Sequence, residues 1–312
     1  MMPLDPQQKE VLDSMKALGD PPHHTVSPEV ARANAARRPQ MPGPPVAEVE
    51  DRMIAGPGGE LLVRVYKPEG VGPFPVLMYF HGGGWVLGSV QATDAVCRHL
   101  VNGAGCIVAS VEYRLAPEAK FPAAAEDCYA ATVWIANNAE SLDGDSARIA
   151  VSGGSAGGNL ATVVALMARD RGEPSIIHQT LIYPVIQRDF TTRSYEENAE
   201  GYFLERKTME WYWGHYLRDE KDATNPYAAP IHAETLEGLP PALVITAEFD
   251  PLRDEGEKYA AALLAAGVQT TCTRYSGVAH LFYQAPERID KGRLAIEETT
   301  LALRTVFETH ST

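Results

Sequence analysis

A serine set among glycines at residues 153–157 is the feature that most restricts how this chain folds. The letters Gly-Gly-Ser-Ala-Gly fit the G-x-S-x-G pattern, in which a strained turn between a strand and a helix pushes the serine hydroxyl clear of the backbone. Residues 149–151 form a short apolar strand before the turn, and apolar residues recur at helical spacing over 160–167. The pattern predicts a nucleophilic Ser155, with a flexible glycine loop between two core elements as the alternative.

Stretches typical of strands and helices alternate through most of the chain. Strands are predicted at residues 49–56, 61–68, 75–80, 106–113, 149–151, 179–184, 242–250 and 270–277. Helices are predicted at residues 5–18, 27–38, 94–102, 123–138, 156–168, 205–217, 254–266 and 291–309. The first two strands are expected to form an antiparallel hairpin. The later alternation predicts an α/β fold, with a mostly parallel central sheet of about eight strands and helices on both faces.

Two regions interrupt this alternation. Residues 185–230 form a long polar and aromatic insertion, which is a candidate cap over the site. Residues 1–46 contain two predicted helices and a proline-rich linker. We therefore expect a catalytic domain made of residues 47–184 and 231–312, with the insertion and the N-terminal region outside it.

Composition excludes several classes of partner. The chain has 27 basic and 41 acidic residues, and its formal net charge of -14 repels nucleic acids and anionic bilayers. No apolar run approaches the roughly 18 residues that span a membrane, and no signal peptide is evident. We expect a cytoplasmic protein without stable membrane insertion. Its four cysteines have no zinc-ligand spacing, so we expect them to be small core residues and expect no metal site.

A serine hydroxyl is a weak nucleophile at neutral pH, so it needs a histidine to accept its proton and a carboxylate to orient that histidine. After this kind of turn, the acid and then the histidine follow the serine along the chain. Only His280 and His310 follow every plausible acid. His280 comes just after the predicted strand 270–277, whereas His310 lies near the C-terminus. The sequence therefore predicts His280 as the base.

The acid is expected at the end of the strand before that histidine. Asp250 closes the predicted strand 242–250, immediately before Pro251. Asp254 is the alternative, but it falls at the start of the next helix, where capping is a sufficient reason for an aspartate. Asp250 is therefore the predicted acid.

A glycine run after the third predicted strand offers amides for an oxyanion. Attack on an ester produces a tetrahedral oxyanion, which must be met by backbone N–H groups already in place. Glycine lets the backbone turn its amides toward the site, and Gly83 and Gly84 are the expected donors. Ala156 joins them at the start of the helix after the serine. His81 precedes the serine, so we expect it to hold the glycine loop by hydrogen bonds.

Taken together, these motifs resemble those of the hormone-sensitive lipase family of α/β-hydrolases, the bacterial family IV esterases. The resemblance runs from about Ala47 to the C-terminus. It is carried by HGGGW at 81–85, YRLAPE at 113–118, GGSAGGN at 153–159, DPLRDEG at 250–256 and the G-x-x-H of 277–280. Family members usually have Asp or Thr before the nucleophile, whereas this chain has Gly154.

The resemblance implies an α/β-hydrolase fold and a serine carboxylesterase that hydrolyses short- to medium-chain acyl esters through an acyl-enzyme. Ser155, Asp250 and His280 match the family's triad, and no metal or organic cofactor is required. The cap would consist of the N-terminal helices and the insertion. The resemblance is compatible with a homodimer, and a monomer is the alternative. The alternatives are a non-catalytic ligand-binding member of the same fold and an amidase or deacetylase using the same triad.

Six apolar and aromatic residues are candidates for the ester-binding pocket, with a place in the hydrophobic core as the competing interpretation: Trp85, Tyr202, Phe203, Leu204, Trp211 and Trp213.

Overall fold

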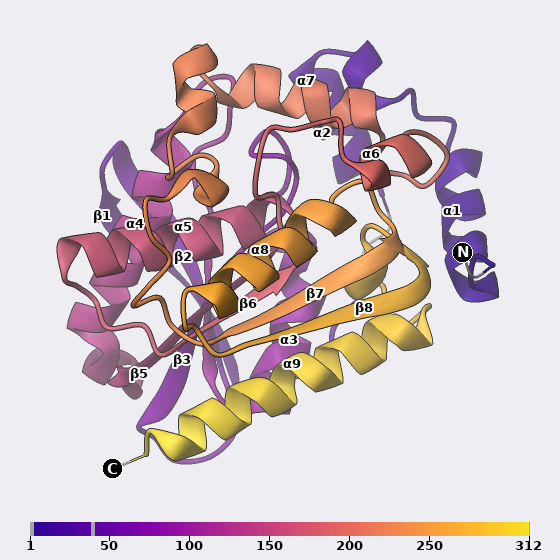
Figure 1. Cartoon of the computed structure of the whole chain (residues 1–312). Helices are drawn as coiled ribbons and strands as arrows, with labels where there is room; N and C mark the ends of the chain where they lie inside the picture. The colour runs from indigo at the N-terminus through magenta and orange to yellow at the C-terminus, as the bar shows by residue number, and fades with distance from the viewer. Residues whose placement is uncertain (1–2, 39–40, 312) are drawn as a thin grey trace.

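The centre of the molecule is a twisted sheet, which a computed structural model describes together with the rest of residues 3–38 and 41–311 (Figure 1). Within these residues the sheet has eight strands in the order β1-β2-β4-β3-β5-β6-β7-β8. The strands are β1 Glu48–Gly56, β2 Gly59–Lys67, β3 Phe74–Phe80, β4 Ile107–Val111, β5 Gly144–Gly154, β6 His178–Ile182, β7 Ala242–Phe249 and β8 Thr270–Ala279. β1 and β2 are antiparallel, β2 is antiparallel to β4, and the remaining neighbours are parallel. The predicted mostly parallel sheet is confirmed.

Helices cover both faces of the sheet (Figure 1). The α-helices are α1 Pro6–Ala17, α2 Pro28–Ala36, α3 Asp94–Ala104, α4 Ala123–Asn138, α5 Ala156–Arg171, α6 Arg193–Glu197, α7 Arg206–Tyr216, α8 Arg253–Ala265 and α9 Asp290–Thr309. Short 3₁₀ segments lie at His23–Thr25, Gln91–Thr93, Ala139–Leu142, Glu220–Thr224, Pro230–His232 and Phe282–Gln284. α3 and α9 lie on one face, and α4, α5 and α8 lie on the other. None of the helices in the described ranges is long and apolar enough to cross a bilayer.

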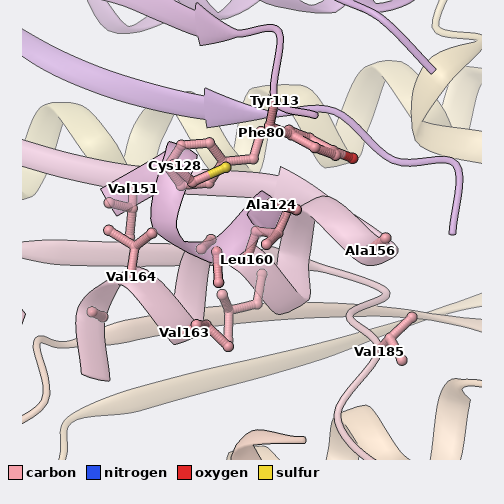
Figure 2. Close-up of a cluster of buried hydrophobic side chains, with 14 of the residues drawn as sticks. Phe80, Tyr113, Ala124, Cys128, Val151, Ala156, Leu160, Val163, Val164 and Val185 are labelled. Carbon is pink, nitrogen blue, oxygen red and sulfur yellow. The ribbon is translucent and has the colours of Figure 1, made fainter. Parts of the chain in front are cut away.

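Alternate residues of each buried strand enter two different cores, because successive side chains of a strand point to opposite faces. In β3, Val76 and Met78 join the core on the α4 and α5 side, and Leu77 joins the core on the α3 and α9 side. Figure 2 shows the first of these cores, where Val151 of β5 packs beside Val164 of α5. A strand buried on both faces reads as a continuous apolar run, which explains the composition of β3.

Three of the four cysteines are buried, as the composition predicted. Cys97, Cys106 and Cys128 lie in the cores, and all four cysteines are free thiols. The prediction was wrong for Cys272, which is exposed. It lies on β8, an edge strand of the sheet, so its position lacks the cover that the central strands receive.

The N-terminal region and the insertion between β6 and β7 lie around one side of the sheet. α2, α6 and α7 are grouped beyond the layer formed by α5 and α8, and α1 lies beside them near the end of β8 (Figure 1). The helices expected at residues 5–18, 27–38 and 205–217 are present as α1, α2 and α7. The division into catalytic and cap domains stays a prediction, and its residues 1, 2, 39, 40 and 312 lie outside the described ranges.

Candidate active site

The carboxyl ends of the parallel strands gather the predicted site residues at one edge of the sheet. Ser155 follows β5, Asp250 follows β7 and His280 follows β8. Parallel strands all end at the same edge, which is where open α/β sheets carry their sites. The order of the strands therefore brings to one edge residues that are far apart in the chain, such as Ser155 and His280.

Ser155 occupies a strained turn. Its backbone angles are φ 60° and ψ -121°, so it adopts a conformation that few residues other than glycine take. The surroundings permit only small side chains: a Cβ at Gly157 would overlap the carbonyl oxygen of Phe80, and a Cβ at Gly153 would overlap the Gly157 carbonyl. The side chain of Ser155 is 6% exposed. The strand and helix on either side force the turn to present the serine at the sheet edge.

Asp250 and His280 form a buried pair. Nδ1 of His280 lies 2.7 Å from Oδ2 of Asp250, and both side chains are buried. The other carboxylate oxygen of Asp250 accepts a hydrogen bond of 2.9 Å from the Leu252 N–H. A carboxylate at Nδ1 fixes that nitrogen as the N–H donor and leaves Nε2 free to accept a proton.

The two alternative residues lie elsewhere. Asp254 lies in the first turn of α8 but does not cap this helix; its carboxylate accepts hydrogen bonds from the N–H of Ser194 at 2.8 Å and from Nε of Arg253 at 2.9 Å. His310 is at the exposed end of α9, where its Nδ1 lies 2.8 Å from the Val306 carbonyl oxygen. The structure thus pairs Asp250, and not Asp254, with His280.

The glycine loop after β3 lies beside the serine. A Cβ at Gly82 would be 3.4 Å from the Cβ of Ser155. Gly83 and Gly84 have φ values of 112° and 60°, which favour glycine, and the Gly83 carbonyl accepts a hydrogen bond of 2.8 Å from Leu87 N. Ala156 is the first residue of α5, so its N–H has no acceptor within the helix. Ala156 follows Ser155 directly and the glycine loop starts beside Ser155 at Gly82, and the role of Gly83, Gly84 and Ala156 as oxyanion donors stays a prediction.

His81 supports this loop. Its ring stacks on Tyr113 with centroids 4.1 Å apart, and its Nδ1 lies 2.9 Å from the carbonyl oxygen of Gly82. Burial lowers the pKa of His81 to about 4, which keeps the ring neutral at pH 7. These contacts agree with the predicted task of holding the loop.

The six pocket candidates fall into two groups. Trp85, Leu204 and Trp213 are buried, and the Trp85 ring stacks on Tyr216 with centroids 4.1 Å apart. Tyr202, Phe203 and Trp211 are only partly buried. The Tyr202 ring lies 4.9 Å from that of Phe249, the residue before Asp250. The first group therefore belongs to the packed interior, whereas Tyr202 lies beside the end of β7.

Two tyrosines at the site were absent from the sequence prediction. The Tyr183 ring lies 4.4 Å from the His280 ring and is fully buried, and the Tyr212 ring packs directly against Gly84. Tyr183 closes the predicted strand 179–184, so its place at a strand end was an available signal. Tyr212 had no such signal, because its contact depends on how α7 packs over the glycine loop.

No cluster of three or more His, Cys, Asp or Glu side chains able to hold a metal occurs within residues 3–38 and 41–311. The arrangement is that of an enzyme built on a strand-ending serine, a histidine–carboxylate pair and a glycine loop. Residues 77–284 match the family described as alpha/beta hydrolase fold. The chain belongs to this family of α/β-hydrolases.

Several relatives in the family are ester hydrolases by name. Carboxylic ester hydrolase LipN of Mycobacterium tuberculosis is 45% identical over 251 residues, which are 78% of this chain and 66% of LipN. An arylesterase of Saccharolobus solfataricus is 40% identical over 295 residues, 91% of this chain and 94% of that protein. The solved structure of a hyperthermophilic esterase from Pyrobaculum calidifontis aligns with a TM-score of 0.91 at 41% identity, covering 99% of this chain and 100% of that one. The resemblance to the hormone-sensitive lipase family and the expectation of a carboxylic ester hydrolase are confirmed.

Proposed function

We propose that Ser155, Asp250 and His280 carry out ester hydrolysis through an acyl-enzyme. Ser155 Oγ attacks the ester carbonyl while His280 Nε2 takes its proton, and the returned proton then lets the alcohol leave. A water molecule activated by His280 attacks the acyl-serine, releases the acid and regenerates Ser155. The hydrogen bond of 2.7 Å between Asp250 and His280, at the sheet edge that carries Ser155, is the observation that supports this assignment most strongly.

The oxyanion is assigned to the N–H groups of Gly83, Gly84 and Ala156. Each tetrahedral intermediate places a negative charge on the former carbonyl oxygen, and preorganised N–H groups stabilise that charge without reorganising. The positive φ values of the two glycines and the position of Ala156 at the start of α5 support this role.

The acyl group is proposed to be short to medium in length. Tyr212 packs against Gly84, so an aromatic side chain occupies the space beside the glycine loop. Tyr202, Phe203 and Trp211 remain as residues that the acyl or alcohol group would meet. An amidase or deacetylase would use the same residues. Comparing p-nitrophenyl esters with a p-nitroanilide distinguishes ester cleavage from amide cleavage by the leaving group.

Three further features belong to the same proposal. Four free thiols suit a reducing, cytoplasmic compartment.

A homodimer would use β8, which ends the sheet and exposes Thr271, Cys272 and Arg274. The cap would comprise the N-terminal helices and residues 185–230.

The test is release of p-nitrophenol from the acetyl, butanoyl, octanoyl and palmitoyl esters, with acetyl p-nitroanilide for amide cleavage. Ser155→Ala, checked for folding by circular dichroism, serves as the control. We expect saturable turnover that is greatest at short or medium chains and falls by several orders of magnitude in the variant. A folded wild-type protein that binds the esters but releases no p-nitrophenol would favour the ligand-binding alternative.

A further inference from the structure

The segment that carries His280 leaves the sheet at an unprotected edge. Among the described residues β8 has one neighbouring strand, β7, and its pairing with β7 shifts register between Ala247 and Phe249. Beyond the shift, Ala279 stands opposite Phe249. Gly277 in this segment has φ 76°. Backbone groups of an edge strand that point away from the sheet need partners from outside it.

Helix α1 and its N-cap residue Asp5 provide two of those partners from the other end of the chain, and the Gly277 N–H donates to the Glu248 carboxylate at 2.8 Å. The N–H of Asp5 donates to the carbonyl oxygen of Gly277 at 2.8 Å. The side-chain oxygen Oε1 of Gln8 accepts a hydrogen bond of 3.1 Å from the N–H of Ala279. Gln8 is 1% exposed, so an N–H left without this acceptor would have little access to water.

We propose that Gln8 is a positioning residue for His280. Ala279 precedes His280 directly, so the Gln8 amide holds the backbone from which the imidazole extends. Asp250 holds the ring at Nδ1, and Gln8 holds the chain behind it. The contact on the ring and the contact on the adjoining backbone together restrict where Nε2 lies relative to Ser155.

The inference rests on the proposed catalytic role of His280. A displacement of about 1 Å at a reacting group costs roughly 100-fold in rate, so a smaller shift of the histidine segment is expected to lower turnover measurably. Gln8 does not touch the reacting atoms, and its effect is exerted through the position of His280.

Gln7 provides a matched control on the same helix. Its Oε1 accepts a hydrogen bond of 2.9 Å from the N–H of Asp290, and its Nε2 donates to Oδ2 of Asp290 at 3.1 Å. Gln7 thus joins α1 to the C-terminal part of the chain as Gln8 does, but at the start of α9. Gln7→Met and Gln8→Met each replace an amide with an apolar side chain of similar length.

The experiment compares kcat and KM for p-nitrophenyl butanoate, well below the melting temperatures of all variants. Gln8→Met is expected to lower kcat about 10-fold with little change in KM, while Gln7→Met leaves kcat near the wild-type value. Gln8→Glu keeps an oxygen acceptor and is expected to recover most of the lost kcat. Equal losses in the two Met variants, or no loss in Gln8→Met, would overturn the proposal.

A second readout is independent of turnover. The proton between His280 Nδ1 and Asp250 is expected to give a downfield resonance in the ¹H NMR spectrum of the wild-type protein. Gln8→Met is expected to shift or broaden that resonance and Gln7→Met to leave it in place. If the wild-type protein cleaved no ester, the proposed function would fail, whereas an unchanged resonance in Gln8→Met would separately reject the role of Gln8.

Discussion

Gly154 faces the ring of Tyr183 so closely that a Cβ at residue 154 would lie 3.2 Å from Tyr183 Cε2. The same ring lies 4.4 Å from the His280 ring and is fully buried. The Tyr183 ring therefore fills the space that a larger side chain at Gly154 would need. Glycine at residue 154 leaves this space to the Tyr183 ring.

This relationship predicts the result of enlarging Gly154. Gly154→Ala should push the Tyr183 ring toward His280, because a buried ring has little room to move, and should lower kcat several-fold. Gly214→Ala is the control, since Gly214 is exposed on α7 and a Cβ there would meet nothing within 4 Å. Steady-state kinetics of both variants test this. An unchanged kcat in Gly154→Ala would show that Tyr183 yields without disturbing the histidine.

Replacing Asp250 and Asp254 one at a time tests which of them is the catalytic acid of the triad. Asp250→Asn should lower kcat by roughly 10⁴-fold, because an amide at this position favours the wrong tautomer of His280. Asp254→Asn should leave kcat unchanged, since an amide oxygen still accepts the hydrogen bond from Ser194 N. A large loss of kcat in Asp254→Asn with a small one in Asp250→Asn would reverse the assignment.

The close packing of the glycine loop predicts a steric effect at Gly84. A Cβ at residue 84 would overlap the Tyr212 ring, and φ there is 60°. Gly84→Ala should therefore move the loop and lower kcat by roughly 100-fold. Gly19→Ala isolates the effect of backbone conformation, because Gly19 has φ 71° and no atom within 4 Å of a Cβ. We expect Gly19→Ala to lower the melting temperature and to leave kcat unchanged. Thermal melts and kcat measured on the same variant test this.

A buried histidine predicts loss of stability in acid. His178 is 4% exposed, neither ring nitrogen has a protein partner among the described residues, and burial lowers its pKa to about 4. Between pH 4 and about 6.5 the unfolded chain binds a proton that the folded chain does not, so the free energy of unfolding falls as pH falls. The loss of unfolding free energy that His178 causes approaches about 3 kcal/mol at pH 4.

Urea unfolding at several pH values measures this contribution. His178→Leu should reduce the dependence of unfolding free energy on pH over this range without abolishing it, because burial also lowers the pKa of His81 to about 4. The exposed His310→Gln should leave the slope as in the wild-type protein. Parallel curves for His178→Leu and the wild-type protein would mean that His178 does not contribute to the acid sensitivity.

The pocket candidates predict two different phenotypes. Trp85 is fully buried, so Trp85→Ala should destabilise the fold by about 3–5 kcal/mol while leaving the ratio of butanoyl to octanoyl turnover unchanged. Tyr202→Ala removes a partly buried ring beside Phe249. This variant should change the ratio of butanoyl to octanoyl turnover without a comparable loss of stability. Identical chain-length profiles for Tyr202→Ala and the wild-type protein would remove Tyr202 from the pocket.

Much of the site was predictable because its parts are local. The apolar strand, the small residues and the helical spacing around Ser155 lie within about twenty consecutive positions, and each follows from backbone periodicity and glycine's conformational freedom. Asp250 and His280 were found because each follows a predicted strand. A strand end is visible in sequence, and parallel strands share an edge, so the separate signals converge on one place.

Sequence patterns alone determined the sheet, the strained turn at Ser155, the glycine loop and the identity of the paired residues Asp250 and His280. Only the tertiary structure decided that Tyr183 fills the space beside Gly154, that Tyr212 covers Gly84, and that Trp85 lies in the interior. It also brought Gln8 to Ala279 across 271 positions. These contacts depend on how helices pack over strand ends, and no periodicity along the chain encodes which distant side chain fills a given space.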